Sequence, residues 1–253
     1  MSPMAGTLYL IPNTLGHAAE DGHDPLDAII PTDVRELTAR LDYFVAENAK
    51  TTRAFLKLVA VRYPLAKPLQ EIEIRELNVN TAANALPALL EPLLAGRDAG
   101  LISEAGVPAV ADPGANLVRL AHAEGVTVKP LVGPSSLLLA VMASGLNGQS
   151  FAFNGYLPVD AAQRAKRLKE LEERSRREKQ TQLFIETPYR NAGMLETLVN
   201  TCHPATLICV ATDITLPSES IQTKTAATWK SEVKSGKMPD FDKKPTVFLL
   251  LSD

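Results

Sequence analysis

The sequence predicts two α/β domains, an N-terminal one with a mostly parallel sheet and a C-terminal one with a mixed sheet. Three observations support this. Short apolar or β-branched runs alternate with longer amphipathic stretches, as in strands joined by crossover helices. This alternation is interrupted after Gly145 and resumes at Phe151. Near the end, apolar runs flank a Ser/Thr-rich stretch, residues 215–228, which favours at least one antiparallel edge.

The N-terminal domain is expected to span residues 1–131. Its helix at 81–95 carries leucines at helical spacing and stops at Gly96, a favourable terminator. Its expected strands are residues 8–11, 43–46, 71–77, 100–103 and 127–131.

The C-terminal domain is expected to span residues 132–253. It opens with a strand signal, FAFNGYLP, followed by a long, highly charged helix over residues 161–179. A strand, TQLFIET, then precedes a helix opened by Pro188. Residues 207–212, the Ser/Thr-rich stretch 215–228 and the terminal run TVFLLL complete the expected mixed sheet.

Composition excludes several classes of protein. The 253 residues are 45% hydrophobic and 22% charged with a net charge of −3, which excludes a disordered chain. The longest apolar run, residues 137–143, is far shorter than the roughly 20 residues of a transmembrane helix. The N-terminus lacks the basic start and apolar core of a secretory signal, so we expect a cytoplasmic protein. A pI near 5.9 restricts any RNA contact to a local patch.

Several common chemical motifs are absent. The sequence has no G-x-G-x-x-G after its first apolar run, no Walker A motif, no H-E-x-x-H and no G-x-S-x-G. Its four histidines lack ligand spacing, so we expect no metal site. Cys202 and Cys209 are expected to pack in or near a buried strand and to form no disulfide framework.

The most informative loop is LISEAGVPAVADPG, residues 101–114. It follows a strand, where ligands bind in open α/β sheets, and its small residues allow close approach of the backbone. We favour ligand contact for its opening residues Ser103, Glu104, Ala105 and Gly106. For Asp112, followed by Pro113, we favour capping of the next helix.

Three further stretches place polar groups at strand ends. Gly133, Pro134, Ser135 and Ser136 precede an apolar helix, and they suit an anion or a plain helix cap equally well. Glu186 ends a strand and can accept hydrogen bonds from a ribose diol or an amine.

Arg190 is placed to pair with Glu186, and a surface ion pair is the alternative interpretation. In VAENAKTTRAF, Glu47 and Asn48 close a strand, and Lys50 and Arg53 extend from the next helix.

These stretches, in this order, resemble the tetrapyrrole (corrin and porphyrin) methylase superfamily. Within it they resemble the branch of the ribosomal RNA small-subunit methyltransferase I. That branch has motifs close to LYVVATPIGNL, AAEDTRHT, LISDAGTPGISDPG, PGPSA, F-x-G-F-L-P and F-Y-E-S-P-H-R. This chain has LYLIPNTLGH, VAENAKTT, LISEAGVPAVADPG, VGPSS, FAFNGYLP and FIETPYR. The third motif is the specific one, and the resemblance covers residues 8 to about 200.

The resemblance implies a tetrapyrrole methylase-like fold that binds S-adenosylmethionine in a cleft between two domains and forms a homodimer. It implies an S-adenosylmethionine-dependent methyltransferase whose acceptor is a ribose hydroxyl of ribosomal RNA. The implied cofactor-binding residues are Pro12, Ser103, Glu104, Ala105, Gly106, Pro108, Gly133, Ser135, Ser136, Glu186 and Thr187.

The presumed substrate side departs from the family pattern. The family's T-P-I-G-N becomes Asn13, Thr14, Leu15, Gly16 and His17, and its E-D-T-R becomes E-N-A-K over residues 47–50. A hydroxyl acceptor must lose its proton, and the candidates that lie near strand ends on this side are Glu47, Lys50 and His17.

Other functions stay open at this point. A tetrapyrrole-like small molecule is an alternative acceptor, and a non-catalytic RNA-binding or assembly protein is an alternative use of the same fold. A sugar-phosphate enzyme would use the helix start after Gly133. The basic helix 163–179 is either a strip for RNA phosphates or a solvated helix with pairs such as Lys169 with Glu173, and we favour the solvated helix.

Overall fold

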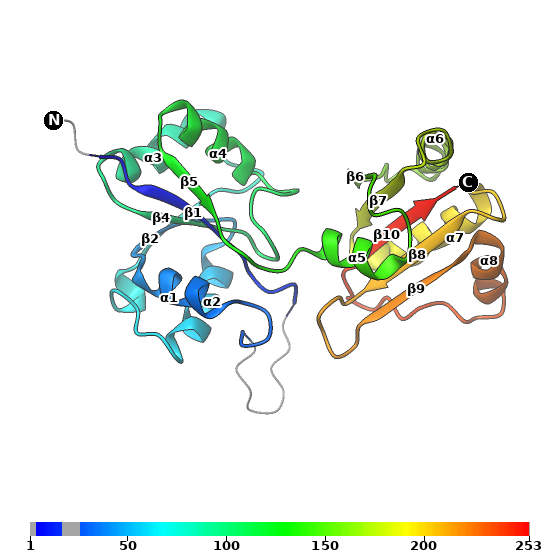
Figure 1. Ribbon diagram of the computed structural model, residues 1–253, viewed down its shortest axis with the longest axis horizontal. Coiled ribbons are helices and arrows are strands. Elements are labelled where there is room, and N and C mark those ends of the chain that lie inside the picture. Colours follow the sequence, from blue (N-terminus) through cyan, green and yellow to red (C-terminus); the bar gives the residue numbers. More distant parts are fainter. Residues whose placement is uncertain (1–3, 17–25, 253) are drawn as a thin grey trace. The chain divides into compact units, whose positions relative to one another are not determined.

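The computed structural model describes residues 4–16 and 26–252 and divides into two compact units, residues 1–135 and 136–253 (Figure 1). Each unit has its own five-stranded sheet with helices packed against it. The first sheet is parallel and the second is mixed, which confirms the predicted fold class.

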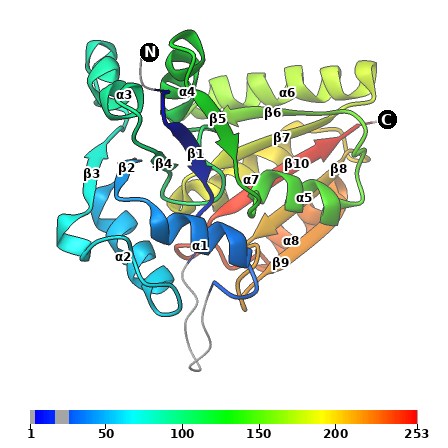
Figure 2. The same ribbon diagram turned by 60° about the vertical axis from the view of Figure 1, so that its left-hand side comes forward.

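The sheet of the first unit has the strand order β3-β2-β4-β1-β5, with every neighbouring pair parallel. The carboxyl ends of all its strands therefore meet at one edge (Figure 2). The strands are β1 (Thr7–Ile11), β2 (Tyr43–Ala46), β3 (Glu73–Glu76), β4 (Ala99–Ile102) and β5 (Thr127–Pro130).

Helices cover both faces of this sheet. On one face, Phe44 packs with side chains of α1 (Thr32–Arg40) and α2 (Ala49–Ala60). On the other, Leu8 packs with α3 (Leu86–Leu94) and α4 (Gly114–Ala123). Because both faces are buried at the centre of the sheet, β2 and β4 are apolar runs without alternation, whereas the edge strands β3 and β5 carry charged residues.

Several element boundaries differ from the sequence prediction by one residue or more, and two of these differences have a clear cause. The strand expected at residues 71–77 is β3 alone, because the chain first makes a 3₁₀ turn, η1 (Leu69–Glu71), after Pro68. The helix expected at 81–95 begins later, with a 3₁₀ turn, η2 (Ala83–Ala85), before α3. Pro87 favours this later start, since proline is preferred in the first turn of a helix, and α3 also accommodates a second proline, Pro92, further along.

The second unit has the strand order β6-β7-β10-β8-β9. β6 (Phe151–Tyr156) is parallel to β7 (Thr181–Glu186), and all other neighbours are antiparallel. The remaining strands are β8 (Leu207–Thr212), β9 (Ser220–Thr225) and β10 (Thr246–Leu251).

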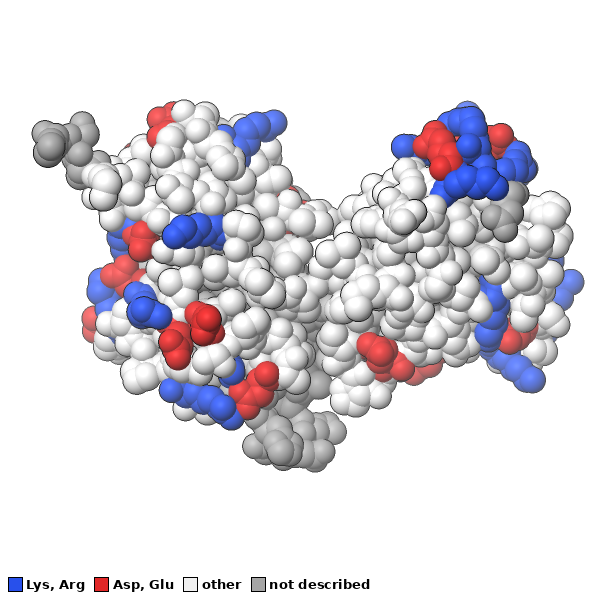
Figure 3. Space-filling view, viewed as in Figure 1, with Lys and Arg blue, Asp and Glu red and all other residues white. Residues whose placement is uncertain are grey.

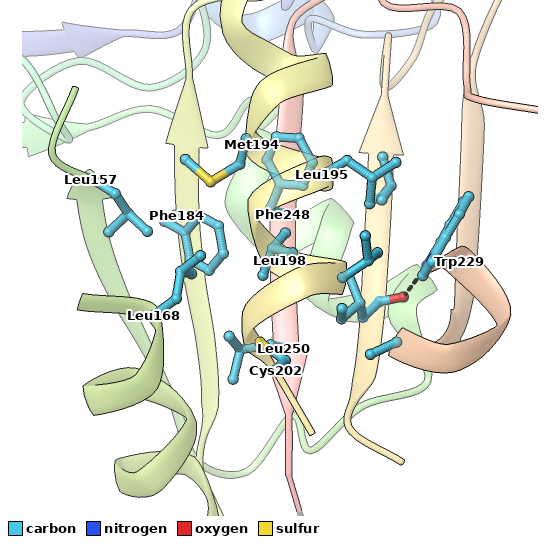
Figure 4. Close-up of a cluster of buried hydrophobic side chains, with 14 of the residues drawn as sticks. Leu157, Leu168, Phe184, Met194, Leu195, Leu198, Cys202, Trp229, Phe248 and Leu250 are labelled. Atoms are coloured by element: carbon cyan, nitrogen blue, oxygen red, sulfur yellow. Dashed lines mark hydrogen bonds between the residues drawn. The ribbon is translucent and has the colours of Figure 1, made fainter. Parts of the chain in front are cut away.

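The core of the second unit lies under three helices, α6 (Ala161–Glu178), α7 (Asn191–Thr201) and α8 (Ala226–Lys234) (Figure 4). A 3₁₀ turn, η3 (Pro188–Arg190), precedes α7, and α5 (Ser136–Ser144) packs against β9 and β10. The buried indole of Trp229 donates a 2.9 Å hydrogen bond to the carbonyl oxygen of Ile208, so its polar edge is satisfied.

Both cysteines are buried and unbonded to each other, Cys209 within β8 and Cys202 after α7. This confirms the expectation that they pack in or near a strand. Burial raises the pKa of the Cys202 thiol to about 12, so it stays protonated and unreactive at neutral pH. No helix in residues 4–16 and 26–252 has the length and apolar content needed to cross a membrane.

Phe248→Ala is expected to destabilise the second unit by about 3–5 kcal/mol, the usual cost of emptying a buried aromatic site. Phe248 is fully buried and stacks on Phe184 with ring centroids 6.0 Å apart. Urea unfolding followed by tryptophan fluorescence measures the loss, because Trp229 lies in the same cluster. Phe151→Ala is the control, since Phe151 is 40% exposed, and an equal loss in both variants would contradict the expectation.

Candidate functional site

The segments that follow β1, β2, β4 and β5 are brought together at the carboxyl edge of the first sheet, as the sequence predicts for a parallel arrangement. Direct contacts link three of these segments around the loop that follows β4. The backbone N–H of Asn13 donates to the carbonyl oxygen of Gly106 at 2.8 Å, and that of Gly106 donates to Thr14 at 3.2 Å. The loop 103–106 is thus tied to the end of β1.

The side chain of Asn13 strengthens this link. Its amide Nδ2 donates to the carbonyl oxygens of Ser103 and Glu104, both at 3.1 Å, and its Oδ1 accepts from the backbone N–H of Thr14 at 2.8 Å. Asn13 is buried, so these bonds are shielded from water. Asn13, one of the residues that depart from the family's T-P-I-G-N pattern, therefore holds the loop after β4 in place.

Two glycines allow the segments to approach closely. Gly106 has φ +66, and a Cβ there would lie 3.1 Å from Leu15 Cδ2 and 3.4 Å from the carbonyl oxygen of Pro134. A Cβ on Gly133 would lie 2.1 Å from Cβ of Pro12. Pro12, Gly106 and Gly133, all expected at the cofactor site, therefore lie in one contact network.

Glu47 joins the network from the end of β2. Its Oε2 accepts a 3.1 Å hydrogen bond from the backbone N–H of Glu104. Asn48 caps α2, its side chain accepting from the backbone N–H groups of Lys50 and Thr51. An asparagine caps as well as the family's aspartate, so this departure keeps the helix start. Lys50 is exposed on the first turn of α2.

Asp112 acts as the cap that the sequence predicts. Its Oδ1 accepts from the N–H of Gly114 at 2.7 Å and its Oδ2 from the N–H of Ala109 at 2.8 Å. Burial raises the pKa of this carboxyl group, and the nearby charge of Glu47 adds to the rise. The two bonds hold a loop in which Ala109 and Ala111 have φ of 66 and 62, a conformation that costs an L-residue about 1–2 kcal/mol.

The second unit, considered by itself, has a buried carboxylate at the end of β7. Glu186 Oε1 accepts from the backbone N–H of Thr187 at 2.7 Å and pairs with Arg190 Nη2 at 2.7 Å. The side chain of Glu186 is only 1% exposed, so this pair is not the surface ion pair of the alternative interpretation. Its other oxygen, Oε2, is buried without a hydrogen-bond partner in the described chain.

A buried carboxylate oxygen without a partner is costly and is usually satisfied by something that the protein binds. A hydroxyl or amine donor meets this requirement, as the sequence suggested for Glu186.

Other polar residues lie near Glu186. The register of the strands places Thr246 beside both Glu186 and Thr212 in the sheet. Asn191 donates to the Thr246 hydroxyl at 3.0 Å, while its own Oδ1 is buried and unpartnered among the described residues.

The remaining predicted residues have these positions. Pro108 is buried in the loop after β4, while Glu104 and Ala105 are exposed there. Ser135 ends the first unit and Ser136 begins α5, so the helix starts where the sequence indicates. His17 lies outside the described residues. Among the residues that are described, no group of three or more His, Cys, Asp or Glu side chains is arranged to hold a metal ion.

Asn13, Asn191 and Thr246 were not among the predicted site residues. The signal for Asn13 was available, since a polar residue directly follows an apolar strand. No such signal exists for Thr246, because antiparallel pairing of β10 with β7 brings it beside Glu186, sixty positions earlier. Asn191 begins α7, and its contact with Thr246 is likewise not visible in the sequence.

Comparison with known families supports the resemblance seen in the motifs. Residues 30–229 match the family model of the Tetrapyrrole (Corrin/Porphyrin) Methylases. The chain belongs to this family. The resemblance stated from the sequence is therefore confirmed, and the protein is a methyltransferase.

Individual relatives of this methylase agree. It is 28% identical over 228 residues to the ribosomal RNA small subunit methyltransferase I of Xylella fastidiosa, covering 90% of this chain and 76% of that protein. It is 30% identical to the protein of the same name from Mesorhizobium japonicum, covering 88% of this chain and 68% of that protein.

Solved structures show the same fold at low sequence identity. The crystal structure of the methyltransferase CobJ aligns with a TM-score of 0.60 at 18% identity, covering 98% of this chain and 95% of that one. Cobalt precorrin-4 methyltransferase, a cobalamin biosynthetic enzyme, aligns with a TM-score of 0.56 at 16% identity, covering 97% and 94%.

Asn13→Ala is expected to release the loop 103–106, because two carbonyl oxygens and one N–H lose their partner. The loss of stability should be about 1–3 kcal/mol, and amide exchange at residues 104–106 should accelerate. Chemical denaturation and hydrogen exchange measure both effects. Asn116→Ala on the exposed surface of α4 is the matched control, and unchanged exchange in the Asn13 variant would refute the role given to its side chain.

Proposed function

We propose that this methylase transfers a methyl group from S-adenosylmethionine to a ribose hydroxyl of small-subunit ribosomal RNA. The observation that supports the cofactor is the buried oxygen of Glu186 in the second unit, which has no hydrogen-bond partner among the described residues. Within the first unit, the contact network of the loops after β1, β4 and β5 is a separate observation that supports a ligand there. The names of the curated relatives support the acceptor.

The residues present fit an adenosyl cofactor. Glu186 Oε2 suits a hydroxyl or amine donor, and Thr187 lies next to it. In the first unit, the loop 103–106 is held in one conformation by Asn13 and Glu47, and its carbonyl oxygens, which each accept one hydrogen bond, keep a second lone pair for a polar ligand. A site with several convergent polar groups held in place in advance is favourable for binding.

When bound, S-adenosylmethionine supplies an electrophilic methyl group on a sulfonium sulfur. The task of the chain is to hold the acceptor in line with that group, and positioning of this kind contributes as much as about 7–11 kcal/mol to catalysis. The acceptor hydroxyl must also lose a proton. Glu47 is the favoured base, because one carboxylate oxygen is fixed by Glu104 while no hydrogen bond reaches the other from the described residues. Lys50 and His17 remain alternative candidates.

The family resemblance also supports a homodimer, and an acceptor in ribosomal RNA supports action in the cytoplasm. Sedimentation velocity of the purified chain tests the dimer, and a single species at the monomer mass would refute it.

Glu186→Gln is expected to weaken binding of S-adenosylmethionine, because the neutral amide loses a charge-assisted hydrogen bond worth about 1.5–3 kcal/mol, roughly a ten- to hundredfold rise in Kd. Calorimetry with S-adenosylmethionine and S-adenosylhomocysteine measures this. The control is Glu196→Gln on the exposed face of α7. No binding of either ligand by the unmodified chain, or a response only to phosphosugars, would refute the proposed cofactor.

Glu47→Gln is expected to lower kcat for RNA methylation about 10²-fold or more, with little change in cofactor affinity. The amide oxygen still accepts from Glu104, so the loop is kept while the base is lost. Methyl incorporation into small-subunit ribosomal RNA, located by mass spectrometry, measures the rate. Glu76→Gln is the control, because Glu76 also accepts a backbone N–H, that of Ala49, at the end of a neighbouring strand.

The outcomes of the methylation assay distinguish the alternatives. Full activity of the Glu47 variant would exclude Glu47 as the base. Cofactor binding without methylation of RNA would support a non-catalytic role or a small-molecule acceptor.

A further inference from the structure

Helix α6 and the residue that follows it, Lys179, form the basic strip of this acidic chain. Residues 161–179 carry twice as many Lys and Arg side chains as Glu, although the whole chain has a net charge of −3. Figure 3 shows blue side chains gathered over α6, with fewer red ones among them. The cations are Arg164, Lys166, Arg167, Lys169, Arg174, Arg176, Arg177 and Lys179.

The glutamates of the basic strip neutralise only part of the positive charge of its Lys and Arg side chains. Glu172 turns inward, where it accepts hydrogen bonds from the backbone N–H of His203, at 2.7 Å, and from the hydroxyl of Thr206. The remaining three acids each pair with arginines of the same helix. The pairs are Glu170 with Arg167, Glu173 with Arg176, and Glu178 with both Arg174 and Arg177.

Three lysines of the basic strip, Lys166, Lys169 and Lys179, are exposed and have no ion-pair partner in the part of the chain that the structure describes. The expected pair of Lys169 with Glu173 does not form, because Glu173 pairs with Arg176. The helix is therefore only partly the solvated, self-paired helix that the sequence favoured. Four of its arginines pair with acids of the same helix, as that interpretation requires, and its three lysines do not.

The inner face of α6 holds the basic strip in place. Leu168 and Leu171 are fully buried in the core of the second unit, and the buried hydroxyl of Ser175 accepts a 3.0 Å hydrogen bond from the backbone N–H of Ser252. Arg164 is tied to the Thr197 hydroxyl at 3.1 Å. Lys166 and Lys169, three residues apart, therefore extend from one side of a fixed helix.

We propose that the basic strip on α6 binds the phosphate backbone of the RNA substrate, with Lys166 and Lys169 as its principal contacts. This inference rests on the proposed function, since it needs an RNA acceptor. Lysine is a suitable ligand for phosphate as a point charge, and such contacts position an RNA without reading its sequence. An acidic protein gains RNA affinity only where cations are concentrated locally, and these residues provide such a place.

The test is the double variant Lys166→Glu/Lys169→Glu, with Lys234→Glu/Lys237→Glu as the matched control. The control lysines are also exposed, three residues apart and in the second unit. Binding of a small-subunit ribosomal RNA transcript is measured from 50 to 300 mM salt, and S-adenosylhomocysteine binding is measured in parallel. The α6 variant should bind RNA more weakly and lower the slope of log K against log salt by about 2, one for each phosphate contact.

Lys166→Gln/Lys169→Gln should bind RNA with an affinity between those of the unmodified chain and the Glu variant, and cofactor affinity should stay unchanged in all variants. Equal RNA binding by the α6 variant and the control would overturn the inference and leave the proposed function intact. Failure of the unmodified chain to bind or methylate the transcript would overturn both, and the cofactor measurement would show whether the methyl donor site survives.

Discussion

The hydrogen bonds of Asn13 are the interaction on which the site of the first unit depends. A parallel sheet brings strand ends to one edge, but it does not fix the loops that leave it. Here one buried amide joins the end of β1 to the carbonyl oxygens of Ser103 and Glu104, and Glu47 holds the same loop from β2. Unpaired backbone groups at such depth are costly, so these bonds select one loop conformation.

This arrangement explains how the chain departs from the family pattern without losing the fold. Asn13 replaces a threonine of the motif and provides three hydrogen bonds, and Asn48 replaces an aspartate as a helix cap. Both side chains hold backbone groups in place, and the second change also removes a negative charge beside the end of β2. The positions are thus constrained by hydrogen-bonding capacity more than by residue identity.

In the second unit, by contrast, a buried hydrogen-bond acceptor has no donor among the described residues. Glu186 is fixed by Thr187 and Arg190 through one oxygen, while the other stays buried and unpartnered among the described residues. On the same unit, the lysines of the basic strip are exposed and unpaired. A buried acceptor suits a small polar ligand, because the ligand must leave water to reach it. Exposed cations suit a polyanion, because the polyanion stays in contact with water when it binds them.

The sequence by itself determined the fold class, most strand and helix positions and the family, since hydrophobic periodicity and the ordered loop motifs are local signals. It also predicted that Arg190 pairs with Glu186 and that Asp112 accepts a hydrogen bond at the start of the next helix, because strand ends and helix starts have local signatures. Only the tertiary structure decided that Asn13 joins two loops, that Glu186 is buried and that Glu173 prefers Arg176 to Lys169. These depend on which side chains meet across strands and turns, and no local pattern contains that information.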